Sequence, residues 1–130
     1  MWIEPKTDYT NNDFFNAEDY NRIVGNISHL RLLSLRLVKK YDLNIDFENK
    51  DYTKVPYASE FKALNTAIDI INKNTYNLAL GKAVEVGKKL PTANFYNRVE
   101  QATLDLYNAM MAQYDALEKY PITLGLRGLF

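Results

Sequence analysis

The residues that could do chemistry are few in this chain of 130 residues, and they are scattered along it. His29 is the only histidine, and there is no cysteine. His29 lies in a stretch with helical periodicity and has no Asp or Glu at metal-ligand spacing, so we interpret it as a surface or boundary histidine. Ser28 is its direct neighbour and cannot meet its ring along one helix, which argues against a nucleophile with a histidine base.

The acidic residues form one short group that could bind a cation. Asp46, Glu48 and Asp51 alternate in a polar stretch, in the manner of a loose calcium loop. The stretch lacks the central glycine and the closing glutamate of an EF-hand, so we favour a solvated loop. The sequence also lacks phosphate-binding, dinucleotide-binding, zinc-protease and serine-hydrolase motifs, and nothing singles out a carboxylate pair of the glycosidase kind. We therefore predict a protein that is not an enzyme and that uses no metal or cofactor.

The charge balance argues against nucleic acid and membranes as partners. The 16 basic and 16 acidic residues cancel, so the chain has no global attraction for a polyanion. Arg31, Arg36, Lys39 and Lys40 form a modest basic cluster without interleaved aromatic residues, and we interpret it as a solvated helix face. No apolar run approaches the roughly 20 residues that span a bilayer, and the N-terminus lacks the features of a signal peptide.

Three helices are predicted to position these residues within one domain, residues 1–130. Apolar residues recur with alternating spacings of three and four in residues 16–41, 57–86 and 92–120. Asn16 is a suitable N-cap for the first of these helices. Residues 1–15 are predicted to form an extended arm and residues 121–130 a short apolar tail.

The three predicted helices begin with one repeated pattern. Ala17-x-x-Tyr20-x-x-Ile23 aligns with Ala58-x-x-Phe61-x-x-Leu64 and with Ala93-x-x-Tyr96-x-x-Val99. The string Tyr-Asn-Arg occurs in the first and third, and Asp8-Tyr9-Thr10 recurs as Asp51-Tyr52-Thr53. Helices of similar length and phase predict an all-α, up-down-up three-helix bundle. The predicted structural residues at the helix starts are Asn16, Tyr20, Arg22, Phe61, Tyr96 and Arg98.

The arm and the tail carry the candidate partner-binding residues. Aromatic side chains bury a large area at low entropic cost, so they are favoured at protein interfaces. A phenylalanine before Asn16 could instead staple the start of the first helix. Two interpretations stay open, because the arm and the tail could cover their own bundle or another subunit. The candidates are Trp2, Pro5, Tyr9, Phe14, Phe15, Leu126, Leu129 and Phe130.

One segment resembles a group of known proteins. It is Trp2-x-x-Pro5-Lys6-Thr7-Asp8-Tyr9 followed by Asp13-Phe14-Phe15-Asn16-x-x-Asp19-Tyr20-Asn21-Arg22-Ile23. It resembles segments of minor structural proteins (tail, baseplate or fibre-associated) of phages and prophages of low-GC Gram-positive bacteria. The resemblance covers residues 2–30 and is weaker over 58–71 and 91–106.

The resemblance implies a non-enzymatic virion protein, an adaptor in the tail, baseplate or neck that assembles in the cytoplasm of the bacterial host. Its expected partners are other virion proteins and further copies of itself, because virion positions are symmetric. The alternative is a small phage-encoded helical protein that binds and inhibits a host protein.

Overall fold

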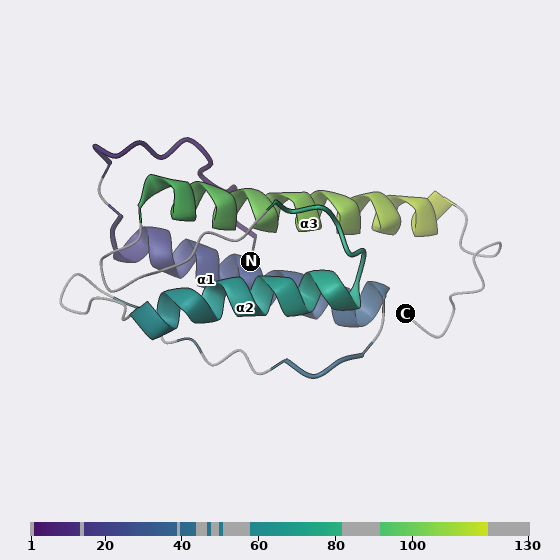
Figure 1. The fold of residues 1–130 in the computed structure, drawn as a ribbon. Coiled ribbons are helices and arrows are strands. Elements are labelled where there is room, and N and C mark those ends of the chain that lie inside the picture. Colours follow the sequence, from purple (N-terminus) through teal and green to yellow (C-terminus); the bar gives the residue numbers. More distant parts are fainter. Residues whose placement is uncertain are drawn as a thin grey trace.

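The computed structural model describes residues 2–13, 15–38, 40–43, 47, 50, 58–81 and 92–119. In this part of the chain the protein is all-α, with helices α1 (Ala17–Leu37), α2 (Ala58–Asn74) and α3 (Ala93–Lys119) and no strand (Figure 1). Each helix packs against the other two. The predicted all-α fold of three packed helices is therefore confirmed. None of the described helices is long and apolar enough to cross a membrane.

The predicted up-down-up order is wrong, because all three helices run in the same direction (Figure 1). Near the helix starts, the ring of Phe61 lies 6.2 Å from the rings of both Tyr20 and Tyr96. Near the other end, Gln113 donates a hydrogen bond of 2.8 Å to the Leu37 carbonyl and accepts one from the Tyr76 hydroxyl. Residues equally far from the three helix starts therefore lie at the same level of the bundle.

Long connections make this parallel order possible. The 21 residues of α1 extend over about 32 Å, at about 1.5 Å per residue. A chain that returns over this length needs about ten extended residues. Residues 38–57 and 75–92 separate the helices, so both connections are long enough. Short loops would instead indicate antiparallel neighbours.

The helix ends depart from the predicted ranges at two places. α1 ends at Leu37 rather than at residue 41, and α2 ends at Asn74 rather than at residue 86. After α2 the chain turns at Asn77, which has a positive φ of 50° and donates its N–H to the Asn72 carbonyl at 2.8 Å. A left-handed asparagine is a common helix stop, because its short polar side chain tolerates this conformation.

The core consists of the predicted apolar seams, which the parallel order brings to matching levels. Ile23, Leu64 and Val99 occupy equivalent positions in the three helices, and each is 0% exposed. Asn16 caps α1 as predicted: its side chain accepts the Asp19 N–H at 3.0 Å, and the Asp19 carboxylate accepts the Asn16 N–H at 3.0 Å. This reciprocal pair is a capping box. The other buried seam residues are Tyr20, Ile27, Leu30, Ser34, Leu37, Phe61, Ile68, Ile71, Tyr96, Thr103, Leu106, Met110 and Leu117.

Candidate functional site

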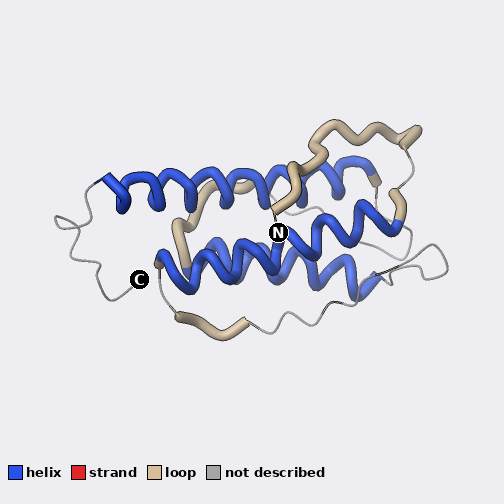
Figure 2. Tube along the Cα trace, turned by 180° about the vertical axis from the view of Figure 1, so that it is seen from behind, coloured by secondary structure: helices blue, strands red, loops and turns tan. Residues whose placement is uncertain are grey.

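The N-terminal arm lies on α1 and α3 of its own chain (Figure 2). The Trp2 indole stacks on the Tyr107 ring of α3, with the ring centroids 4.0 Å apart and the planes 4° from parallel. His29 of α1 lies beside both rings, 6.1 Å from Trp2. Pro5 and Tyr9 are buried. Of the two interpretations left open by the sequence, the structure shows the intrachain one for the described part of the arm.

Four asparagine side chains hold non-helical segments against the helices in the same way. In each pair the side-chain oxygen accepts an N–H from the partner residue, and the side-chain NH₂ donates to the carbonyl of that same residue. The eight hydrogen bonds measure 2.7 to 2.9 Å. One amide thus satisfies both backbone groups of a residue that has no helical partner. The pairs are Asn26–Ile3, Asn97–Tyr9, Asn21–Lys50 and Asn72–Leu78.

The repeated string Tyr-Asn-Arg has a structural cause in these pairs. Its central residues, Asn21 and Asn97, hold Lys50 and Tyr9 respectively. Lys50 and Tyr9 stand the same distance before Ala58 and Ala17, the first residues of α2 and α1. Each Tyr-Asn-Arg string therefore marks a place where an asparagine of one helix holds the non-helical segment that leads into another helix.

A buried ionic cluster fastens the arm at Tyr9. Arg22 of α1 forms two parallel bonds to Glu100 of α3, at 2.7 Å from Nε and 2.8 Å from Nη2. Nη2 also donates to Asp19 at 2.8 Å and to the Tyr9 hydroxyl at 2.6 Å. The Tyr9 hydroxyl donates toward Glu100 and lies 3.2 Å from Asp19. The arm adds the Lys6 N–H, which donates to Glu100 at 3.1 Å.

The electrostatics of this cluster suit a structural role. The Glu100 side chain is 0% exposed, and Arg22 and Asp19 are 16% and 12% exposed. Burial and the neighbouring Glu100 carboxylate raise the pKa of Tyr9 well above its ordinary value, so its hydroxyl stays protonated and can donate. Bonds to Glu100 and Asp19 likewise raise the pKa of Arg22 against the opposing effect of its burial. Both Glu100 oxygens are engaged within the protein, so the cluster is closed to a substrate.

Arg98 occupies the position in α3 that Arg22 occupies in α1, but its contacts are looser. It lies 3.6 Å from Asp69, whose side chain is 58% exposed. It also donates to Asn65 at 3.2 Å and to the Gly81 carbonyl at 3.4 Å. Both arginine side chains are largely buried, at 16% exposed for Arg22 and 11% for Arg98, but Arg22 is paired with the buried Glu100 and Arg98 with the exposed Asp69.

Aromatic rings from the arm and all three helices meet at the end of the bundle where the helices begin. Phe15 stacks on Tyr96, with centroids 3.9 Å apart and planes 2° from parallel. Phe61 lies edge-on to both Tyr20 and Phe95, with interplanar angles of 89°. Phe15, which comes just before the start of α1, therefore packs against α3.

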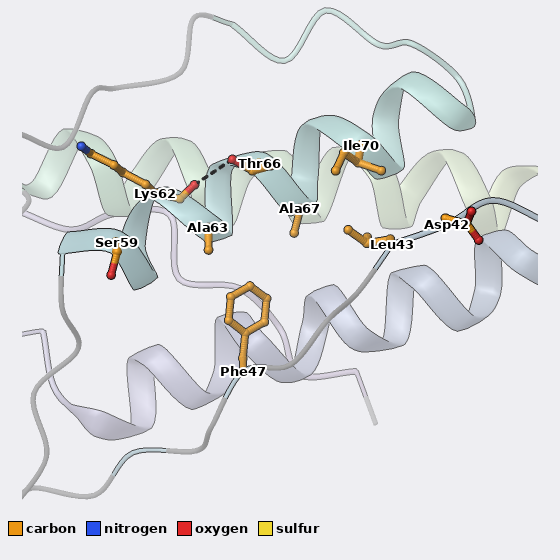
Figure 3. A pocket seen from close by; sticks show the side chains of 9 residues that line it. All are labelled: Asp42, Leu43, Phe47, Ser59, Lys62, Ala63, Thr66, Ala67 and Ile70. Atoms are coloured by element: carbon orange, nitrogen blue, oxygen red, sulfur yellow. Dashed lines mark hydrogen bonds between the residues drawn. The ribbon is translucent and has the colours of Figure 1, made fainter.

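An open groove lies between α2 and the chain that follows α1 (Figure 3). It has a volume of about 640 Å³. In Figure 3 the methyl groups of Ala63 and Ala67 point toward the side chains of Phe47 and Leu43, which face α2 from the other side. The remaining lining residues are Asp42, Ser59, Lys62, Thr66 and Ile70. The groove is mainly apolar at its base and carries charged groups at its edges.

The sequence patterns did not single out Asn26 and Glu100, which hold the arm, and they marked Asn97 only as part of the repeated Tyr-Asn-Arg string. A signal for Glu100 was present, since it follows the seam residue Val99 and lies one turn after Tyr96. A carboxylate next to an apolar seam indicates a buried partner of opposite charge.

The other candidates have different outcomes. Phe14, Leu126, Leu129 and Phe130 lie outside the described residues, as do Asp46, Glu48 and Asp51 of the acidic stretch. Within the described ranges, no group of three or more His, Asp or Glu side chains could hold a metal ion.

Comparisons with known proteins place the chain in no group. No family model, no curated protein and no solved structure matches it. Its function is therefore argued from its own residues and their geometry.

Proposed function

We propose that the chain is a non-enzymatic structural protein of a bacteriophage virion, an adaptor in the tail, baseplate or neck that acts through protein–protein contacts. The resemblance of residues 2–30 supports the virion setting. The observation that carries the proposal is the contrast between a closed polar cluster and an open apolar groove. Tyr9, Arg22 and Glu100 bind one another in the interior, whereas Ala63 and Phe47 line a groove that faces solvent.

The groove favours protein binding over catalysis. Leu43, Phe47 and Ile70 are partly exposed in the groove, and partly exposed apolar surface is one mark of an interaction site. Its lining offers methyl, aliphatic and aromatic groups, with Asp42 and Lys62 at its edges. Apolar residues surrounded by polar ones match the core and rim of a protein interface.

The arm supports the proposal by making the bundle rigid. It joins α1 to α3 through Asn26, Asn97 and the cluster around Arg22, with contacts that span up to 94 residues of sequence. A scaffold that is ordered before it binds loses less conformational entropy on binding. This property suits an adaptor that must hold neighbouring subunits in one geometry. Assembly as a homo-oligomer is part of the proposal, since virion positions are symmetric.

The test is mass spectrometry of purified phage particles from cells that produce this chain. We expect the chain in intact particles at a constant ratio to the other virion proteins. As a control, a variant with Ala63→Trp in the groove should fold normally but be depleted from particles. If the unaltered chain is absent from particles, the proposal fails, and the alternative of a protein that inhibits a host protein becomes the better account.

A further inference from the structure

Each helix forms one unit with the non-helical segment that precedes it, and residues of two units correspond when they stand at the same distance from Ala17, Ala58 or Ala93, the helix starts. The segment of each unit lies between two helices. The arm contacts α1 and α3, and Lys50 is held by α1 and pairs with α2. Residues 78–81 contact α2 and α3. Each helix therefore receives the segment of another unit: α1 receives that of α2, α2 that of α3, and α3 that of α1.

The segments meet the receiving helices at corresponding positions. The Trp2 indole stacks on Tyr107 of α3, with the ring centroids 4.0 Å apart. Leu78, which corresponds to Trp2, pairs through its backbone with the Asn72 side chain of α2 at 2.7 and 2.9 Å. Tyr107 and Asn72 also correspond, since each follows its helix start by the same number of residues. Two segments of different sequence therefore contact the receiving helix at one position.

The polar contacts nearer the helix starts correspond as well. Tyr9 and Lys50 stand at the same position in their segments, and each is held by the asparagine of a Tyr-Asn-Arg string. The Tyr9 hydroxyl lies 3.2 Å from Asp19, and the Lys50 ammonium pairs with Glu60 at 2.8 Å. Asp19 and Glu60 correspond, and each lies in the first turn of its helix. Both segments are thus tied to their own helix by a carboxylate of its first turn.

A bridge between helices also recurs. Arg22 of α1 donates to Glu100 of α3 at 2.7 and 2.8 Å. Arg98 of α3 donates to Asn65 of α2 at 3.2 Å. The two arginines correspond, and so do Glu100 and Asn65. Each bridge therefore runs from one helix to the helix that receives its segment.

The remaining contact, between α2 and α1, has a different bridge at the same level. The positions of the arginine and its acceptor are occupied there by Ala63 and Val24. The cation comes instead from Lys50 of the segment, whose side chain is 6% exposed and pairs with Glu60. All three contacts between helices therefore include a cation, which the helix supplies at two of them and the segment at the third.

We infer that the chain is a single-chain counterpart of a homotrimer, in which three segment–helix units surround one axis and neighbouring units repeat one contact. Each unit presents one surface to the unit before it and a different surface to the unit after it, and such heterologous contacts close into a ring. Lys50 and Glu60 are positioning residues in this arrangement. They hold the segment of α2 as the cluster around Arg22 holds the arm.

The ring closes at the contact that the chain does not connect. Residues 38–57 join α1 to α2 and residues 75–92 join α2 to α3, whereas α3 and α1 are not consecutive. The contact between α3 and α1 carries the two parallel bonds of Arg22 to Glu100, whose side chain is 0% exposed. Charge-assisted, bidentate bonds of this kind are among the strongest side-chain contacts. They lie where no connecting segment holds the two helices together.

The outer surface differs between the units. Leu32, Lys73 and Asn108 correspond, and all three are exposed. One is apolar, one cationic and one neutral and polar, so the repeat is carried by the contacts between units. A partner that binds the outside of the bundle can therefore distinguish the three units. The ring does not depend on the proposed function, because it is a property of the isolated chain.

The first test builds the missing bridge into the contact between α1 and α2. Val24→Glu alone should destabilise the chain, because Val24 is 5% exposed and no arginine occupies position 63. Adding Ala63→Arg should recover part of the loss. Urea unfolding should then show a favourable coupling of about tenfold in the equilibrium constant for unfolding. If Val24→Glu abolishes folding, the same result is a return of helical circular dichroism when Ala63→Arg is added.

Asp69→Arg is the control for the register of this bridge. Asp69 lies 3.6 Å from Arg98 of α3, so it is on a different side of α2 from the one that faces α1. Its combination with Val24→Glu should show a coupling below about twofold. A coupling equal to that of Ala63→Arg would mean that any arginine on α2 compensates the new carboxylate, and the correspondence would be wrong.

The second test moves the opening of the ring. A permuted chain that runs from residue 40 to residue 130 and on through residues 1–39 joins α3 to α1 and leaves α1 and α2 unconnected. Trp2 lies beside Tyr107, which precedes Lys119 by about 18 Å along α3. Residues 120–130 and Met1 extend over about 40 Å, so no linker is added. We expect this chain to fold with a Tm within about 10 °C of the original, because changes in loop length alter stability only slightly.

A second permuted chain is the matched control. It has the same junction between residues 130 and 1 but opens between Met110 and Met111, inside α3, and so breaks a unit. It should lose most of its helical circular dichroism.

Three results would overturn the inference: a coupling of Val24→Glu with Ala63→Arg no larger than with Asp69→Arg, a chain opened after residue 39 that does not fold, or a chain opened inside α3 that is equally stable. None of these measurements involves phage particles. Absence of the chain from particles would therefore refute the proposed function and leave the ring of units intact.

Discussion

Replacing Arg22 by methionine tests whether the buried cluster fastens the arm to the bundle. Arg22 donates to Glu100 at 2.7 and 2.8 Å, to Asp19 at 2.8 Å and to Tyr9 at 2.6 Å. Methionine keeps most of the apolar stem of arginine. The loss in free energy of unfolding therefore reports the removal of the charge and its hydrogen bonds. Removing one partner of a buried ion pair costs about 3–5 kcal/mol, because the other charge stays buried. We expect Arg22→Met to lower the free energy of unfolding by about 3 kcal/mol, the low end of this range. The reason is that Arg22 is 16% exposed, so water can reach part of the site.

Arg98→Met is the matched control. Arg98 follows the same Tyr-Asn pair, but its carboxylate partner, Asp69, is 58% exposed and lies at 3.6 Å. The Arg98 side chain is 11% exposed, but its replacement leaves the solvated Asp69 and no buried carboxylate unpaired, so the loss of the ion pair should cost about 0.2–1 kcal/mol. The two substitutions remove the same chemical group from equivalent, largely buried positions, so their difference measures the cost of leaving the Glu100 carboxylate buried and unpaired.

The assay is urea unfolding followed by far-UV circular dichroism at neutral pH. Arg22→Met should lower the free energy of unfolding by about 3 kcal/mol, which corresponds to a fall in Tm of about 10–15 °C for a chain of this size. Adding Glu100→Gln should recover part of this loss, because the unpaired buried charge is removed. If Arg22→Met and Arg98→Met agree within about 0.5 kcal/mol, or Glu100→Gln recovers nothing, the cluster does not hold the arm as argued.

Three further predictions concern pH and the arm. Burial raises the pKa of Tyr20, Tyr76 and Tyr96 to about 12, so the folded state keeps protons that the unfolded state loses above pH 10.0. Stability is then full below that pH and falls as pH rises toward 12, and tyrosinate absorbance should appear together with the loss of helical circular dichroism. Burial lowers the pKa of His29 below 6.5, so stability should fall as the solution is acidified through that value, and His29→Gln should reduce this dependence in urea titrations. Asn97→Ala removes both bonds to the Tyr9 backbone and should cost about 1–3 kcal/mol, with faster protease cleavage of the arm, whereas Asn94→Ala, at an exposed position, should change neither.

The helices were predictable because their signals are local. Asn16 and Asp19 form the capping box of α1, and both are within one turn of the helix start. Alternating spacings of three and four identified the buried face of each helix, and Ile23, Leu64 and Val99 are fully buried there. The end of α2 was less predictable, because the turn at Asn77 interrupts a stretch with no glycine before Gly81.

The direction of the helices was predicted wrongly, although the sequence contained a relevant signal. Repeated helix starts fit a parallel bundle as well as an antiparallel one, since helix periodicity carries no information about direction. The lengths of residues 38–57 and 75–92 were the better guide, because antiparallel neighbours need only short loops.

By itself, the sequence determined where the helices begin and which faces they bury, because those properties depend on residues within about one turn of each other. Only the tertiary structure decided that the helices are parallel and that the arm lies on its own bundle. The reason is the separation of the contacts in sequence: Tyr9 meets Asn97 and Glu100 across 88 and 91 residues. Arg22 and Arg98 follow the same two residues, yet only the packing of α1 against α3 places a buried carboxylate beside Arg22.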